Sequence, residues 1–120
     1  MSGRRERGQA AIEFAGIITL LLVVALAAIQ LGLVAYAAQQ AGTAARAAAR
    51  TATQDDDGPG RATAAGHAAL SDWLDADISG VPASCEGEGE VTVTVRVQVP
   101  ELLPGFDAGA AERRVTMPCD

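Results

Sequence analysis

Residues 8–38 read GQAAIEFAGIITLLLVVALAAIQLGLVAYAA, an apolar run whose single charge is the carboxylate of Glu13 near its start. About 20 apolar residues in a helix, rising ~1.5 Å each, are enough to cross the hydrocarbon layer of a membrane. A soluble domain built from a chain of 120 residues would not bury so long a run in its core. The sequence therefore predicts an amino-terminal transmembrane helix.

The residues at the start of the run indicate how this helix is used. Three arginines lie within residues 4–7, directly before Gly8. A carboxylate at the edge of a membrane helix is costly and normally has a partner. Cleavage after Gly8 would create one, because the new α-amino group on Gln9 is mostly cationic at neutral pH and lies one helical turn from Glu13. That amino group could neutralise Glu13 of its own chain or of a neighbouring chain.

A basic leader, Gly8, four residues, Glu13, the aromatic Phe14 and a long apolar helix together resemble the class III signal of type IV pilins. The sequence GQAAIEF at residues 8–14 resembles the start of the helix in the TadE-like family of pilin-like proteins, which belong to tight-adherence (type IVb) pilus systems. This resemblance implies cleavage by a prepilin peptidase between Gly8 and Gln9. It also implies a pseudopilin or minor pilin that contacts membrane lipid, and other pilins or pilus assembly proteins, through its amino-terminal helix.

Two other interpretations of the run remain open. In the first, the arginines only hold the amino terminus in the cytoplasm, and the chain is a single-pass anchored extracytoplasmic binding module that forms no filament. In the second, residues 35–37 (Ala-Tyr-Ala) form a secretory cleavage site, although the apolar run exceeds the usual ~7–15 residues of a signal core. The pairing of Gly8 with Glu13 is explained by the pilin interpretation alone.

Charge and residue types argue against several functions. The formal net charge is −6, and removal of residues 1–8, which carry +2, would make it −8. Such acidity argues against direct nucleic-acid binding. His67 is the single histidine, and a calcium loop starting at Asp55 would have Gly66 where it needs a bidentate glutamate. We expect no enzyme activity, no catalytic residue, no cofactor and no metal.

The remaining sequence predicts an α+β protein. The membrane helix should continue as a stalk over residues 9–54, because alanine, glutamine and arginine favour helix and no proline interrupts them. Residues 55–60, DDDGPG, should end it, and residues 61–120 should form one small extracytoplasmic domain. There, Arg61 to about Asp77 is predicted as an amphipathic helix that buries Trp73. After an acidic linker, alternating valines over residues 91–99 predict a strand whose valine face this helix covers.

A weaker strand from about Ala111 to Met117 should pair with the first as an antiparallel hairpin. This pairing would carry Cys119 back to Cys85, which predicts a disulfide in an extracytoplasmic domain. The alternative is two buried free thiols. Closing this loop would stabilise the fold by roughly 3–4 kcal/mol on the loop-entropy estimate.

The stalk also carries a face of small residues where other helices could approach closely. The alternative is that alanine is simply abundant in this chain. The residues of this face are Ala37, Ala38, Ala41, Ala44, Ala45 and Ala48.

Overall fold

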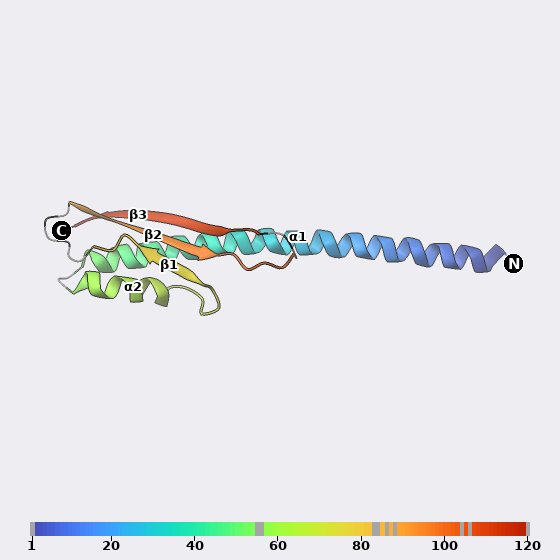
Figure 1. Cartoon of the computed structure of the whole chain (residues 1–120), viewed down its shortest axis with the longest axis horizontal. Coiled ribbons are helices and arrows are strands. Elements are labelled where there is room, and N and C mark those ends of the chain that lie inside the picture. The colour runs from blue at the N-terminus through green and yellow to red at the C-terminus, as the bar shows by residue number, and fades with distance from the viewer. Residues whose placement is uncertain are drawn as a thin grey trace.

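The computed structural model describes residues 2–54, 57–82, 85, 87, 89–103, 105 and 107–119. Its longest element is helix α1, Ser2–Ala52, in a molecule with principal-axis extents of 87 × 21 × 19 Å. Figure 1 shows α1 extending from the amino terminus along nearly the whole molecule. The predicted unbroken helix over residues 9–54 is confirmed, and it ends at Ala52. Alanine is the most frequent residue in its sequence, leucine comes second, and no proline occurs in it, so helix propensity alone favours its continuity.

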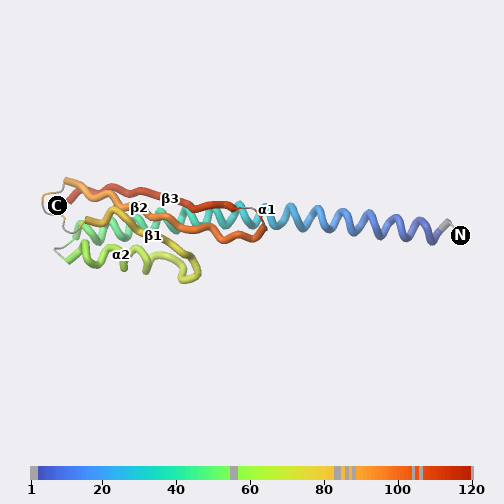
Figure 2. The backbone as a smooth tube through the Cα atoms, in the orientation of Figure 1, coloured from blue at the N-terminus to red at the C-terminus, as the bar shows by residue number. Residues whose placement is uncertain are grey.

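A short helix and three strands follow α1. They are α2 (Gly58–Ala68), β1 (Ala76–Ser79), β2 (Glu90–Gln98) and β3 (Ala110–Pro118). The strands form one antiparallel sheet in the order β1-β2-β3. Figure 2 shows that α2 and the sheet lie along the carboxyl-terminal half of α1 and leave its amino-terminal half bare. The α+β class and the β2–β3 hairpin are confirmed, and β1 adds a third strand to the predicted two.

The predicted second helix is too long and starts too late. Helix α2 begins at Gly58, inside the predicted breaker, because Pro59 occupies the first turn, where its missing N–H costs nothing. It ends at Ala68, and residues 76–79 pair with β2 instead of continuing the helix. The predicted breaker residues Asp55 and Asp56 lie outside the described residues, as do Glu86 and Glu88 of the acidic linker.

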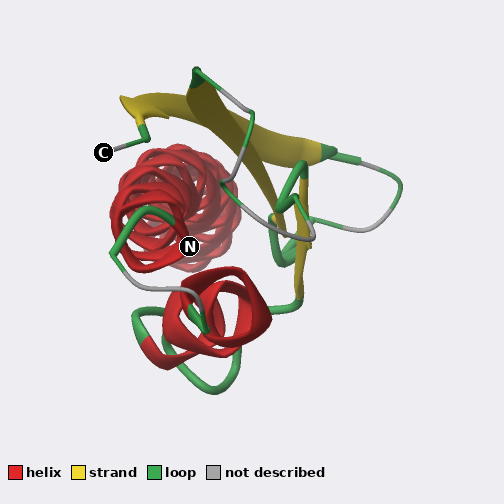
Figure 3. Cartoon of the chain, turned by 90° about the vertical axis from the view of Figure 1, so that its left-hand side faces the viewer, coloured by secondary structure: helices red, strands yellow, loops and turns green. Residues whose placement is uncertain are grey.

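The valine face of β2 is buried, but α1 and not α2 covers it. Figure 3, which looks along α1, shows the sheet curving over one side of α1 while α2 lies on another side. The alternating valines of β2 pack against α1 in the hydrophobic core. Those with almost no exposed surface are Val91, Val93, Val95 and Val97.

Small residues of α1 make this close packing possible. A stripe of alanines on α1 is fully buried by α2 and the sheet, namely Ala37, Ala41, Ala44, Ala45, Ala48, Ala49 and Ala52. The prediction that this face serves other helices is therefore wrong for most of its residues. Within this chain, a face without side-chain bulk lets α2 and the sheet approach the backbone of α1.

Gly66 lies at the contact between α2 and α1. A Cβ at this position would collide with Cδ1 of Ile78 and lie 3.2 Å from Cβ of Ala48. The Ile78 methyl can move, but the alanine cannot, since it belongs to the rigid stripe on α1. The absence of a side chain at Gly66 therefore fixes the spacing of the two helices.

Gly66→Val is expected to destabilise the domain by about 1–3 kcal/mol, the usual cost of overpacking. That corresponds to a fall in melting temperature of several degrees, measured by circular dichroism of the detergent-solubilised protein. Gly60→Val is the matched control in the same helix, because a Cβ at Gly60 meets nothing within 4 Å among the described residues. Equal melting temperatures for the two variants would contradict this account of the packing.

Candidate functional site

The amino-terminal half of α1 is exposed on every side. Residues 3–29, here called the exposed arm, have no buried or half-buried member. Among the helices of the described residues, α1 is the one that is long and apolar enough to cross a membrane. In water, its large apolar side chains would cost ~25 cal/mol for each Å² left exposed. Residues 9–29 span about 30 Å at ~1.5 Å each, which matches the thickness of a hydrocarbon layer.

The predicted processing residues lie together at the start of this arm. Gly8, Gln9, Glu13 and Phe14 are all helical and exposed. A Cβ on Gly8 would meet nothing within 4 Å among the described residues, so the backbone there is sterically open. Glu13 has no ion-pair partner in the described part of the chain. Because Gln9 and Glu13 are one turn apart, an amino group created at Gln9 would lie beside this carboxylate.

Gln30 marks the end of the arm. Its side chain is 2% exposed, and its Nε2 donates a hydrogen bond to the carbonyl oxygen of Pro100 at 3.0 Å. The backbone N–H of Leu102 donates to Oε1 of Gln30 at 2.9 Å. Sequence reasoning missed this residue, although a lone amide in the middle of an apolar run was a usable signal, since a buried amide needs partners.

Three further contacts join α1 to the loop after α2. Trp73, predicted to be buried, is 58% exposed, so that prediction is wrong. Its ring stacks on Tyr36, with the ring centroids 5.7 Å apart and the planes 2° from parallel. The Tyr36 hydroxyl and Oγ of Ser71 form a 2.6 Å hydrogen bond, and the backbone N–H of Ser71 donates to Oε1 of Gln40 at 3.3 Å. Trp73 leaves the core because α2 ends before it.

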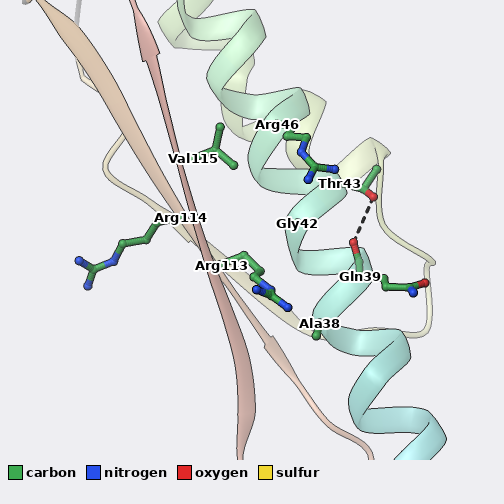
Figure 4. A pocket seen from close by; sticks show the side chains of 8 residues that line it. All are labelled: Ala38, Gln39, Gly42, Thr43, Arg46, Arg113, Arg114 and Val115. Atoms are coloured by element: carbon green, nitrogen blue, oxygen red, sulfur yellow. Dashed lines mark hydrogen bonds between the residues drawn. The ribbon is translucent and has the colours of Figure 1, made fainter.

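An open groove of about 510 Å³ runs between α1 and β3. Figure 4 shows Arg113 reaching from β3 towards α1 beside Gly42, while Arg114 points away from the helix. Arg114 pairs with Glu112, with Nη2 and Oε1 3.5 Å apart. Guanidinium groups of this kind can bind a carboxylate or a phosphate. The residues that line the groove are Ala38, Gln39, Gly42, Thr43, Arg46, Arg113, Arg114 and Val115.

The described residues contain no cluster of histidine, cysteine, aspartate and glutamate that could hold a metal ion. His67 is exposed on α2. The cysteines form a disulfide between Cys85 and Cys119, with Cα atoms 6.0 Å apart. The backbone N–H of Cys119 also donates to the carbonyl oxygen of Gly89 at 3.2 Å. The predicted bridge is therefore present, at the end of the domain opposite the exposed arm, as Figure 1 shows for the carboxyl terminus.

Residues 8–50 match the family model of the TadE-like proteins. The match begins at Gly8 and ends two residues before the end of α1, so it covers most of the exposed arm and nearly all of the stalk. Over this segment, about a third of the chain, the sequence is similar to the TadE-like family, as its opening residues indicated. Comparison with curated proteins and with solved structures gives no significant match.

Proposed function

We propose that this chain is a TadE-like pseudopilin or minor pilin that acts in the assembly or structure of a type IVb, tight-adherence pilus. The observation that carries the proposal is the position of Gly8. The family match starts at this residue, and cleavage after it would expose an amino group one turn from Glu13. The exposed apolar arm supports the same conclusion, since its large apolar side chains need an apolar environment that the described residues of the chain do not supply.

In the proposed pathway, residues 1–8 stay in the cytoplasm, held by their arginines, and a prepilin peptidase removes them. The arm then anchors the mature chain in the cell membrane, with the α2 and sheet domain on the extracytoplasmic side. Assembly with other pilins or pilus assembly proteins uses the arm, because the domain already covers the alanine stripe of the stalk. Gly16 in the arm, and Gly32 just beyond it, would let another helix approach closely, since a Cβ at either meets nothing within 4 Å among the described residues.

The proposal assigns the chain no catalytic residue, no cofactor and no direct contact with nucleic acid. The second candidate is an anchored extracytoplasmic binding module that never enters a filament. The arginine-lined groove between α1 and β3 favours this candidate, because it offers guanidinium donors to an acidic ligand. The module would keep its leader, whereas the pilin would lose it, so processing separates the two.

Coexpression with the prepilin peptidase is expected to yield a mature chain that begins at Gln9, detected by intact mass after extraction from the membrane. Gly8→Val should retain residues 1–8, because the resemblance places the peptidase's requirement at this glycine. Gly3→Val, a matched change within the leader, should be processed normally. A mature terminus at Ala38, or an intact leader in the presence of the peptidase, would refute the processing step.

A further inference from the structure

The end of the domain nearest the exposed arm is formed by two loops. One joins β2 to β3 and is described at residues 99–103, 105 and 107–109, here called the β2–β3 loop. The other joins α2 to β1 through residues 69–75. Figures 1 and 2 show both loops turned towards the amino-terminal half of α1, with the β2–β3 loop reaching farther. If α1 crosses a membrane, these loops are the parts of the domain closest to it.

Gln30 fixes the position of the β2–β3 loop along α1. Its amide bonds to Pro100 and Leu102 hold the near part of the loop beside this residue. Gln30 is also the first buried residue of α1. The loop therefore lies where the bare arm ends and the covered stalk begins.

The apolar surface of α1 continues past Gln30. Leu31 is 70% exposed, and Leu33 and Val34 are half-buried against the core. If Glu13 lies at the cytoplasmic edge, a hydrocarbon layer of ~30 Å accommodates ~20 residues and ends near Leu33. The β2–β3 loop would then lie at the level of the outer membrane boundary, and not above it in water.

The side chains at this end have the character of a membrane interface. Leu102, in the β2–β3 loop, is 42% exposed. Tyr36 lies six residues beyond Gln30, or ~9 Å along the helix, which places its stack with Trp73 at the headgroup layer. Tyrosine and tryptophan favour this layer because each ring combines an apolar body with a polar tip. The hydrogen bonds of Ser71 hold the Trp73 loop against α1 in this orientation.

We propose that this end of the domain docks on the outer leaflet of the membrane, with Leu102 at the hydrocarbon boundary and the Tyr36–Trp73 pair among the headgroups. The inference rests on the membrane-embedded arm of the proposed function. Glu101 and Asp72 are exposed beside the docking residues, so the surface fits zwitterionic headgroups better than anionic ones. Docking would set the orientation of the domain on the membrane, and entry into a filament would require its release.

The single tryptophan of the chain makes the contact measurable. The full chain is reconstituted in phosphatidylcholine vesicles in which some lipids carry bromine, a fluorescence quencher, near the top of the acyl chain. For Leu22→Trp the bromine is placed near the end of the acyl chain, because Leu22 lies ~13 Å along the helix from Glu13 and so near the middle of the bilayer. Three variants move the reporter by combining Trp73→Phe with Leu102→Trp, Leu22→Trp or Glu90→Trp. Leu22→Trp reports the arm, whereas Glu90→Trp is the matched control because it lies near the disulfide, at the opposite end of the domain.

Brominated lipid should quench the Leu22→Trp and Leu102→Trp variants strongly. Leu102→Trp is expected to lose about half of its emission, because the headgroup layer is only ~5–8 Å thick and the reporter lies at its inner side. The wild-type Trp73 should lose less, and Glu90→Trp should lose none. Adding phosphatidylglycerol should not increase the quenching of Leu102→Trp.

Equal emission losses for Leu102→Trp and Glu90→Trp, with Leu22→Trp quenched, would refute the docking while leaving the membrane anchor intact. An unquenched Leu22→Trp would remove the anchor and the docking together. If the circular dichroism spectrum of Leu102→Trp differs from that of the wild type, the docking is tested instead with the wild-type protein, whose reporter is Trp73. Its emission must then fall in brominated vesicles relative to unbrominated ones, and no change would overturn the inference.

Discussion

Glu13→Gln is expected to leave processing and membrane insertion intact but to reduce assembly with other pilus components strongly. Cleavage depends on Gly8, whereas the carboxylate is needed afterwards, to neutralise the amino group at Gln9 of its own or a neighbouring chain. Glu13 is exposed on the arm and has no ion-pair partner among the described residues. Its carboxylate is therefore available to pair with the new amino group. Glutamine can accept a hydrogen bond from the ammonium but cannot cancel its charge. A cation left between helices in lipid costs several kcal/mol.

Copurification with other pilus components, and piliation scored by microscopy, measure this effect. Glu6→Gln is the matched control, because it makes the same change in the leader and processing removes it. In a plain membrane anchor, Glu13→Gln would be harmless or would aid insertion, since it removes a charge from the membrane edge. Wild-type piliation by a correctly processed Glu13→Gln protein would exclude the role assigned to this carboxylate.

The features that the sequence predicted well are those that depend on local patterns. The long apolar run and the alanine-rich segment after it predicted α1 almost to its last residue. The strict alternation of valine with polar residues predicted β2, and the hairpin placed Cys119 beside Cys85. In each case, residues within one or two turns, or within one strand, carry enough information to specify the element.

The features that it missed depend on tertiary contacts. Residues 76–79 have no strand pattern of their own and become β1 because β2 offers a free edge, so Ile78 pairs with Val95 instead of extending a helix. Trp73 consequently leaves the core and stacks on Tyr36. The partners of Gln30 lie 70 and 72 residues away, a separation that no local pattern encodes.

The predicted site divides in the same way. Gly8 and Glu13 were predicted from their spacing in the sequence, and their roles stay a prediction, although the family match begins at Gly8. The alanine face was assigned to partner helices because composition cannot distinguish contact within a chain from contact between chains. Once α2 and the sheet cover that face, the exposed arm is the part of α1 that the rest of the described chain leaves uncovered.

The double replacement Cys85→Ser with Cys119→Ser is expected to destabilise the domain by roughly 3–4 kcal/mol, because the bridge closes a loop with a sequence separation of 34 residues. At ~1.4 kcal/mol per factor of ten, that loss raises the unfolded fraction about 100- to 1,000-fold. It is also a large part of the total free energy of unfolding of a domain, which is ~5–15 kcal/mol. Small alanine and valine side chains form most of the core, so little apolar area is available to offset it.

Loss of the bridge should affect β3 unevenly. Its last residues pair with the start of β2 and lie next to Cys119, the residue that the bridge ties down. Its first end lies far from the bridge, beside the 3.1 Å hydrogen bond from the N–H of Val99 to the carbonyl oxygen of Gly109. Hydrogen exchange should therefore accelerate most in residues 115–117 and least in 110–112. Reduced wild-type protein should reproduce this pattern, which separates loss of the bridge from any effect of the serines. If non-reducing peptide mapping of the exported protein recovers free thiols at both cysteines, the bridge is absent and the prediction is contradicted.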